Sequence, residues 1–145
     1  MLAYHHIDPP AAPGGVKVFQ MVAQAPGLGG WQPDTITVDL HGGGDYETIQ
    51  SGIDASADGD TVLVLPGFYL GVGNYEIDCL GKAVTIMSAS AREPVVVFCG
   101  YMGRGFIFHY GETAETILRG FEIVYADGGG IVCDDSSPTI EECVL

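Results

Sequence analysis

The chain has 145 residues, a normal size for one domain, and 47% of them are hydrophobic, which is enough for a substantial core. Five Lys and Arg residues stand against 19 Asp and Glu residues, which gives a formal charge of -14. This balance argues against nucleic acid and anionic membrane surfaces as partners, because both need clustered positive charge, and an acidic ligand would need a bridging cation.

Residues 1–34 are rich in Pro and Gly and lack periodicity, so we expect an extended arm or leader that precedes the domain of residues 35–145. No basic segment is followed there by an uninterrupted apolar stretch, so the segment does not match a clear signal peptide. No apolar run anywhere in the chain approaches the ~18–20 residues of a transmembrane helix.

The first regular elements are a strand and a helix. Residues 35–39 alternate between apolar and polar side chains, which predicts a strand. Asp45 is the expected N-cap of a helix over residues 46–57, because its carboxylate can accept backbone amide hydrogens. Ile49 and Ile53 lie on one apolar stripe of that helix.

Short strands follow, with no further helix between them. The run 61–65 is almost continuously apolar, which is typical of parallel strands that are buried by their neighbours. Because a single helix cannot provide the crossovers of a βαβ sheet, we expect a coil whose successive turns hydrogen-bond to one another. The further expected strands cover residues 75–79, 84–87, 95–99, 105–109, 117–124 and 129–133.

Repetition in the second half of the chain supports the coil. Thr85, Thr116 and Thr139 each precede an Ile and are separated by 31 and 23 residues, while Gly105 and Gly130 are separated by 25. Such a period, with β-branched strands and Gly, Asp and Ser turns, predicts a solenoid. The expected fold class is all-β, a parallel β-helix with one N-terminal capping α-helix. An antiparallel sandwich or jelly roll is the alternative, and it does not explain the aligned positions.

Four cysteines are present, and no two of them have the CxxC spacing of a zinc or redox motif. Disulfides remain open, since four cysteines allow three pairings. We favour small buried hydrophobic side chains, because free Cys is among the most buried residue types. The four are Cys79, Cys99, Cys133 and Cys143.

Several segments together resemble the right-handed parallel β-helix proteins of the pectin-lyase-like superfamily. The opening Asp45-Tyr46-Glu47-Thr48-Ile49-Gln50, followed by Asp58-Gly59-Asp60-Thr61-Val62 and Pro66-Gly67-Phe68-Tyr69, resembles their N-terminal cap. Gly128-Gly129-Gly130-Ile131-Val132-Cys133 resembles the turn repeat of bacterial surface and secreted members. The resemblance covers residues 35–145. It implies an extracellular or cell-surface location and polysaccharide as a partner.

The chain departs from that superfamily in two ways. Members commonly carry stacked asparagines at their turns, whereas Asn74 is the one asparagine here. Their coils are also usually longer, and here the repeat stops within a turn. We therefore expect an apolar coil end, formed by Cys143, Val144 and Leu145, that a longer chain or a partner covers. A homo-oligomer through this end is one hypothesis.

Catalytic constellations are weak. Asp134 and Asp135 are an adjacent acidic pair in the coil, and a turn suits them better than a hydrolytic cleft. A lyase would use Arg104 or Arg119 as a base, with Ca²⁺ held by oxygen ligands such as Asp127, Asp134 and Asp135. No tight Asp-x-Asp-x-Asp loop is present, so no catalytic residue and no cofactor is predicted, with Ca²⁺ kept as the alternative.

Aromatic residues are the better functional indication. Tyr101 and Tyr125 fall in expected loops, where they can stack on sugar rings along the coil, with Arg104 and Arg119 as polar contacts. Ordinary loop packing is the alternative. The preferred hypothesis is a non-catalytic β-helix module that binds polysaccharide or acts as a structural spacer. The alternatives are the N-terminal part of a polysaccharide lyase or glycoside hydrolase, and a self-assembling unit.

Overall fold

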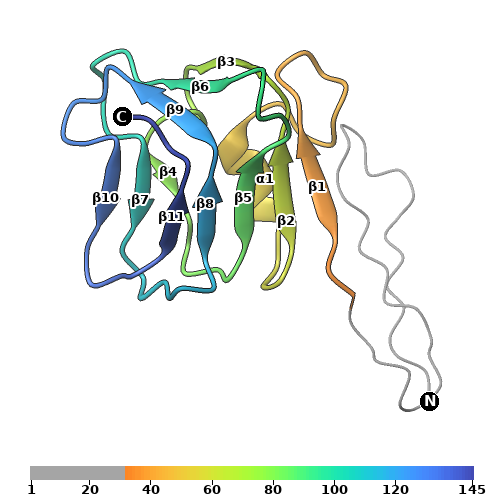
Figure 1. The fold of residues 1–145 in the computed structure, drawn as a ribbon, viewed down its shortest axis with the longest axis vertical. Helices are drawn as coiled ribbons and strands as arrows, with labels where there is room; N and C mark the ends of the chain where they lie inside the picture. Colours follow the sequence, from red (N-terminus) through yellow and green to blue (C-terminus); the bar gives the residue numbers. More distant parts are fainter. Residues whose placement is uncertain (1–31) are drawn as a thin grey trace.

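The computed structural model describes residues 32–145, so the proposed arm over residues 1–34 lies almost entirely outside the described residues. This part of the chain forms three parallel β-sheets and one short α-helix (Figure 1). The elements are β1 (Thr35–Val38), α1 (Ile49–Ala55), β2 (Thr61–Val64), β3 (Gly67–Leu70), β4 (Ile77–Asp78), β5 (Thr85–Ser88), β6 (Val95–Phe98), β7 (Phe106–Phe108), β8 (Ile117–Arg119), β9 (Phe121–Val124), β10 (Ile131–Cys133) and β11 (Thr139–Glu141).

The chain winds as a parallel β-solenoid of about four turns. Each complete turn gives one strand to each sheet, so the sheets have the orders β1-β2-β5-β8-β11, β3-β6-β9 and β4-β7-β10. The register is strict: Thr61 pairs with Thr85, which pairs with Ile117, which pairs with Thr139. The predicted all-β coil with one helix is confirmed, and Thr85 and Thr139 of the repeat occupy equivalent positions.

The core fills the inside of the coil. Alternate residues of β2, β6 and β9 are buried, which is the period-two pattern of a strand with one face inward. The largest fully buried side chains are Tyr69, Phe106, Phe108 and Phe121. Each such apolar side chain contributes roughly 1.5–3 kcal/mol of burial free energy. The stability of the coil therefore comes from inward side chains that stack on the equivalent positions of the next turn.

The segment 117–124 was expected to form one strand, and this prediction is wrong. Gly120 has a φ of +82° and turns the chain between β8 and β9, which belong to different sheets. A Cβ atom at Gly120 would lie 3.1 Å from the Cβ of Ser88 in the neighbouring turn. One glycine therefore makes a corner of the coil, and the β-branched and apolar residues on both sides of it concealed this corner.

The predicted helix of residues 46–57 begins later and is shorter. Thr48 is the N-cap of α1, and its hydroxyl accepts a hydrogen bond from the Ser51 amide at 3.2 Å. Asp45 is not the N-cap, because its carboxylate accepts from the Thr37 amide of β1 at 2.8 Å. Tyr46 is held extended by its bridge to Val38. Residues 45–46 thus cover the outer edge of β1 and do not join the helix.

The helix replaces the third strand of the first turn. The Gln50 side chain bonds both backbone groups of Asp78 in β4, accepting from its N–H at 2.8 Å and donating to its C=O at 3.0 Å. A primary amide thereby reproduces the two bonds that a neighbouring strand would offer. Ile49 and Ile53 are fully buried beneath the helix, as predicted. The edge of β4 is therefore closed by a side chain.

Two polar side chains hold the helix ends in place. Asn74 accepts from the Ile49 amide at 3.0 Å and donates to the Leu70 carbonyl at 3.1 Å. At the other end, the Lys82 ammonium donates to the carbonyls of Ile53, Asp54 and Ser56, at 2.7, 3.0 and 2.7 Å. A cation on the last carbonyls of a helix is favourable. The single asparagine thus anchors the cap instead of joining a ladder.

Substitution of Gln50 by Ala tests this closure. The change leaves both backbone groups of Asp78 without partners, so the free energy of unfolding should fall by about 1–3 kcal/mol. Chemical denaturation in urea measures it. Asp54→Ala, which removes only the contact of Gln50 on the helix surface, is the control and should change the unfolding midpoint much less. Equal unfolding midpoints for wild type and Gln50→Ala would contradict the proposal that the Gln50 side chain takes the place of a neighbouring strand.

No cysteine is paired in a disulfide among residues 32–145, where all four lie. Cys79 and Cys99 are buried and Cys143 is half-buried, in agreement with their expected role as small apolar side chains. Burial raises the pKa of all four thiols. Cys133 is exposed and contradicts the expectation. It ends β10, which pairs with β7 on one side in the described part of the chain.

Glu112 links three consecutive turns at one corner of the coil. Its carboxylate accepts hydrogen bonds from the Gly81 amide at 2.9 Å, the Tyr110 amide at 2.9 Å and the Ser136 hydroxyl at 2.7 Å. Burial alone raises the pKa of Glu112, but these hydrogen bonds to the charged form outweigh it, and the net pKa lies below its usual 4.5. The ionised carboxylate therefore stabilises the stacking of the turns.

This gives a pH dependence with a defined sign. Because the folded-state pKa of Glu112 is depressed, its stabilisation is complete above the unfolded value of 4.5 and is lost as the pH falls through the folded value. The difference in unfolding free energy between wild type and Glu112→Gln should be large at pH 7 and shrink at pH values below the depressed pKa. Urea denaturation across this range measures it, and a constant difference would show that the charge is irrelevant.

Candidate functional site

An aromatic stripe crosses the outside of the β3-β6-β9 sheet. It consists of Phe68, Phe98, Tyr125 and Tyr101, and this name is kept below. The ring centroids of Phe68 and Phe98 are 5.0 Å apart, those of Phe98 and Tyr125 are 5.3 Å apart, and those of Tyr125 and Tyr101 are 5.1 Å apart. Phe68, Tyr125 and Tyr101 are 49%, 53% and 69% exposed. Four rings thus form one connected surface feature.

Strand register explains why the rings meet. Phe68 pairs with Val96, which pairs with Glu122. Leu70 pairs with Phe98, which pairs with Val124, so two rows of side chains point outward from this sheet. Five of these six residues are apolar. A sheet face that meets water usually carries polar side chains at these positions. The outer face is therefore unusually apolar, and Val72 and Met102, 86% and 68% exposed, extend it into the turns.

The two tyrosines have the same backbone conformation in neighbouring turns of the coil. Tyr101 and Tyr125 both have left-handed backbones, with φ of 60° and 55°, and the Tyr101 amide donates to the Tyr125 carbonyl at 2.7 Å. Leu80 and Asp135 adopt the same conformation in other turns. The left-handed residue is thus a general device of the turns in this coil and by itself indicates no ligand. It does place the two tyrosines side by side.

Arg104 lies in the same stack of turns as the tyrosines but is committed to Glu76. Its guanidinium makes two hydrogen bonds to that carboxylate, at 3.0 and 2.6 Å, and its backbone amide donates a third at 2.7 Å. These contacts with Arg104 lower the pKa of Glu76 below its usual value. A bidentate pair of this kind uses the directional donors of Arg104. Arg104 therefore holds its turn in place, and most of its directional hydrogen-bond donors are already used, so it offers few of them to a ligand.

The Arg104 contact is testable by titration. Arg104→Gln removes the cation and both side-chain hydrogen bonds, so the pKa of Glu76 should rise toward its usual 4.5. Carboxyl carbon chemical shifts followed by NMR against pH measure this directly. Arg119→Gln, at another corner of the coil, is the matched control and should leave the Glu76 titration unchanged. A Glu76 pKa that does not move in Arg104→Gln would contradict the assignment.

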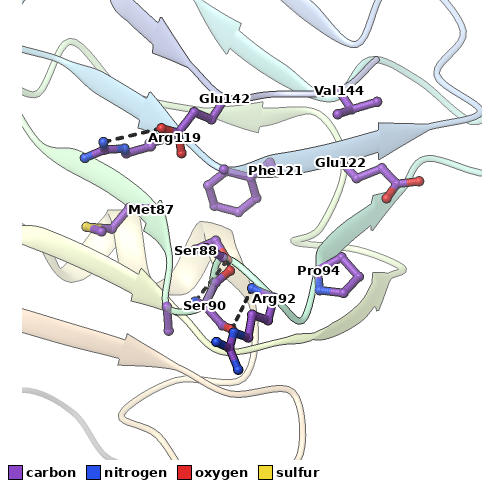
Figure 2. A pocket seen from close by; sticks show the side chains of 13 residues that line it. Met87, Ser88, Ser90, Arg92, Pro94, Arg119, Phe121, Glu122, Glu142 and Val144 are labelled. Atoms are coloured by element: carbon purple, nitrogen blue, oxygen red, sulfur yellow. Dashed lines mark hydrogen bonds and ion pairs between the residues drawn. The ribbon is translucent and has the colours of Figure 1, made fainter.

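Arg119 lies in a different place, at the rim of an open groove of about 510 Å³ between the loop after β5 and the start of β9 (Figure 2). Its guanidinium approaches Glu141 at 3.4 Å and Glu142 at 3.6 Å. Arg92 and Ser90 lie on the opposite side of the groove in Figure 2, and Glu122 lies beside Pro94. Of the four residues predicted to contact a ligand, Arg119 alone lines this groove.

The predicted calcium ligands are separated. Asp127 is in the turn after Tyr125, its amide bonded to the Gly103 carbonyl at 2.9 Å, whereas Asp134 follows β10 and bonds the Phe108 carbonyl at 2.8 Å. Asp135 turns the chain with a φ of 49°, which agrees with the expected turn. Within residues 32–145, no three His, Cys, Asp or Glu side chains gather in a way that could hold a metal ion.

The residues of the predicted coil end take up an extended path beside β9. The Val144 amide donates to the Phe121 carbonyl at 2.9 Å, and the Ile123 amide donates to the Val144 carbonyl at 2.8 Å. Val144 and Leu145 are 62% and 72% exposed, and the Cys143 thiol lies near the Leu118 and Glu141 carbonyls. A homo-oligomer interface at these residues stays a prediction.

Sequence reasoning missed two kinds of contact. Phe68 and Phe98 were not recognised as neighbours of the tyrosines, although their outward positions follow once the strand register is known. The contacts of His109 were also missed: its ring makes a 2.8 Å contact with the Asp78 carboxylate and packs against Tyr110 with 4.1 Å between centroids. This pair joins the ends of β4 and β7 and lies outside the aromatic stripe.

No protein-family model matches the chain, and neither does any curated protein or solved structure. In the described part of the chain, no helix is both long and apolar enough to span a bilayer. The site must therefore be interpreted from its own geometry, in which an apolar aromatic surface and an open groove lie at the two ends of one sheet.

Proposed function

We propose that this protein is a non-catalytic β-solenoid module that binds polysaccharide through the aromatic stripe. The single observation that carries the proposal is the contiguity of four rings, from Phe68 to Tyr101, on the outside of the coil. Aromatic rings offer broad apolar faces together with the hydroxyls of Tyr101 and Tyr125, a combination suited to the C–H faces and hydroxyl edges of sugars. Scattered exposed aromatics would not provide such a track.

The size of the surface favours a chain ligand over a protein partner. Three strands of four residues give a face of roughly 14 Å by 13 Å from standard strand dimensions. A stable dimer needs about 800 Å² on each partner, which this face does not reach even with its turns. Apolar patches of a few hundred Å² on monomers are often functional. A sugar chain a few residues long fits this footprint.

The resemblance of the capping segment to the pectin-lyase-like superfamily supports the same proposal. Asp45-Tyr46-Glu47-Thr48-Ile49-Gln50 resembles the opening of these proteins, and here it folds into the bridge and helix that start a parallel coil. Many members of that superfamily act on polysaccharides outside the cell. We therefore propose membership of this superfamily and an extracellular or cell-surface location.

The positions of the buried acids support a non-catalytic role. Asp60 accepts from the Asp34 amide at 2.8 Å and from the Ala57 amide at 2.9 Å, and Glu112 has the three contacts described above. Both carboxylates are thus engaged in holding backbone turns. A general acid needs a carboxyl free to meet its substrate and with a pKa raised toward neutrality, and the pKa of Glu112 is lowered.

The groove favours a second candidate, a polysaccharide lyase or glycoside hydrolase. It brings Arg119 together with Glu122 and Glu142, a cation and two carboxylates on the surface of one cavity. Reducing-end or unsaturated-uronate assays on polysaccharide mixtures would detect cleavage. Cleavage that disappears in Arg119→Ala would replace the non-catalytic proposal with this one.

Loss of ring faces tests the binding proposal. The double variant Tyr101→Ala/Tyr125→Ala should weaken polysaccharide binding by about tenfold or more, if each stacking contact contributes on the order of 1 kcal/mol. Affinity electrophoresis in gels containing single polysaccharides, followed by calorimetry on those that retard the protein, measures it. Tyr110→Ala is the matched control, because this tyrosine is 62% exposed but lies outside the stripe. Equal losses in both variants would contradict a specific stripe.

A further inference from the structure

The charges around the aromatic stripe restrict the class of its ligand. Building on the proposed function, we infer that the stripe takes an uncharged saccharide chain, laid parallel to the axis of the coil, and discriminates against polyuronates. The inference depends on two separate observations. The first is the direction in which the rings follow one another, and the second is the state of each charged group on this face.

The rings advance along the axis of the coil. Phe68 belongs to β3, Phe98 to β6, and Tyr125 follows β9, and these strands are neighbours in one sheet from three successive turns (Figure 1). Phe68 pairs with Val96 and Phe98 pairs with Val124, so the rings of Phe68, Phe98 and Tyr125 meet diagonally across the strands, with 5.0 and 5.3 Å between successive centroids. A line through the rings therefore crosses the strands. A ligand stacked on Phe68, Phe98 and Tyr125 must run from turn to turn along the coil. Tyr101 lies beside Tyr125, the last of these three rings.

Four charged residues occur in this sheet and in the turns 71–76, 99–105 and 125–130 that follow its strands: Glu76, Arg104, Glu122 and Asp127. The one cation, Arg104, is neutralised by the bidentate contact with Glu76. Glu122 points outward in the same row as Phe68, and Asp127 is exposed two residues after Tyr125. Glu122 and Asp127 therefore have no paired cation among these four residues, although Glu122 also lines the groove that Arg92 and Arg119 line.

The nearest other arginines stand at the wrong end of the sheet. Arg92 and Arg119 precede β6 and β9, on the side of the sheet where Phe68 and Glu122 lie, whereas the tyrosines and Asp127 follow these strands. Four residues of strand separate the two ends by about 13 Å. That distance exceeds the screening length of about 8 Å at physiological ionic strength. The formal charge of -14 adds a repulsive background for any polyanion. At the tyrosine end of the stripe, a uronate chain would meet this repulsion without a cation to offset it, because Arg104 is paired with Glu76, whereas a neutral chain meets no such repulsion.

The test compares saccharides that differ in charge. Calorimetry with the intact chain uses a panel of neutral hexasaccharides of glucose, xylose and mannose, a galacturonate hexamer, and a glucosamine hexamer as a cationic probe, at 50 and 500 mM NaCl. We expect at least one neutral hexamer to bind, with an affinity that changes less than threefold with salt. The galacturonate hexamer should bind at least tenfold more weakly at 50 mM, and its deficit should shrink at 500 mM.

Two further comparisons separate the steps of the inference. Neutral affinity should rise from the disaccharide to the hexasaccharide, since a chain along the axis meets rings from more turns as it lengthens. The variant Glu122→Gln/Asp127→Asn should narrow the gap between galacturonate and neutral hexamers at 50 mM NaCl. Circular dichroism spectra and urea midpoints confirm that the variant is folded.

Each other outcome overturns a defined statement. Tighter binding of galacturonate, or binding that needs the cationic hexamer, overturns the inference of a neutral ligand while leaving a polysaccharide-binding stripe in place. Affinity that is independent of length overturns the axial orientation. If no hexamer in the panel binds, and the protein also migrates freely through every polysaccharide gel, the proposed function itself fails.

Discussion

Parallel strand pairing along the axis of the coil is the constraint on which the rest of the structure depends. Each inner strand of a sheet pairs in register with the strands of the preceding and following turns, so the course of one turn constrains the course of the next. Inward positions become stacks of apolar side chains, and outward positions become rows. The aromatic stripe depends on this repetition, because Phe68 and Phe98 stand in two neighbouring outward rows of adjacent turns and their rings meet diagonally, with centroids 5.0 Å apart.

Corners of the coil are held by polar groups that serve more than one turn. The Glu112 carboxylate collects donors from three turns, Asp60 joins the amides of Asp34 and Ala57, and Thr116 donates its hydroxyl to the Lys82 carbonyl at 2.8 Å. No buried side-chain nitrogen or oxygen in the described residues lacks a hydrogen-bond partner. The turns therefore satisfy their backbones with acidic and hydroxyl side chains, and this explains how the coil dispenses with the stacked asparagines expected by analogy.

Much of the fold could be predicted from the sequence, because the solenoid leaves a repeated pattern and each strand leaves an alternating one. The repeat placed Thr85 and Thr139 at equivalent positions, and Ile49 and Ile53 marked the buried side of the helix. The corner at Gly120 and the true helix start at Thr48 were missed, since both depend on contacts with another turn. The position of Tyr101 and Tyr125 in turns could be predicted from the sequence, and the structure confirms it. Phe68 and Phe98 were not recognised as part of the stripe, because register alone decides whether a ring in a strand lies in the core or on the surface.

The capping helix has a consequence for how the length of such a protein can vary. Gln50 completes the edge of β4 from one side only, so everything needed to begin a coil is contained in the first turn. Each later turn pairs with the strand edges of the preceding turn and offers strand edges of the same kind to the next turn. Gain or loss of an interior turn therefore leaves the beginning untouched and lengthens or shortens the row of outward rings by one member. Under the proposed function, duplication of a turn could therefore change how far the protein reaches along an extended ligand without a new fold.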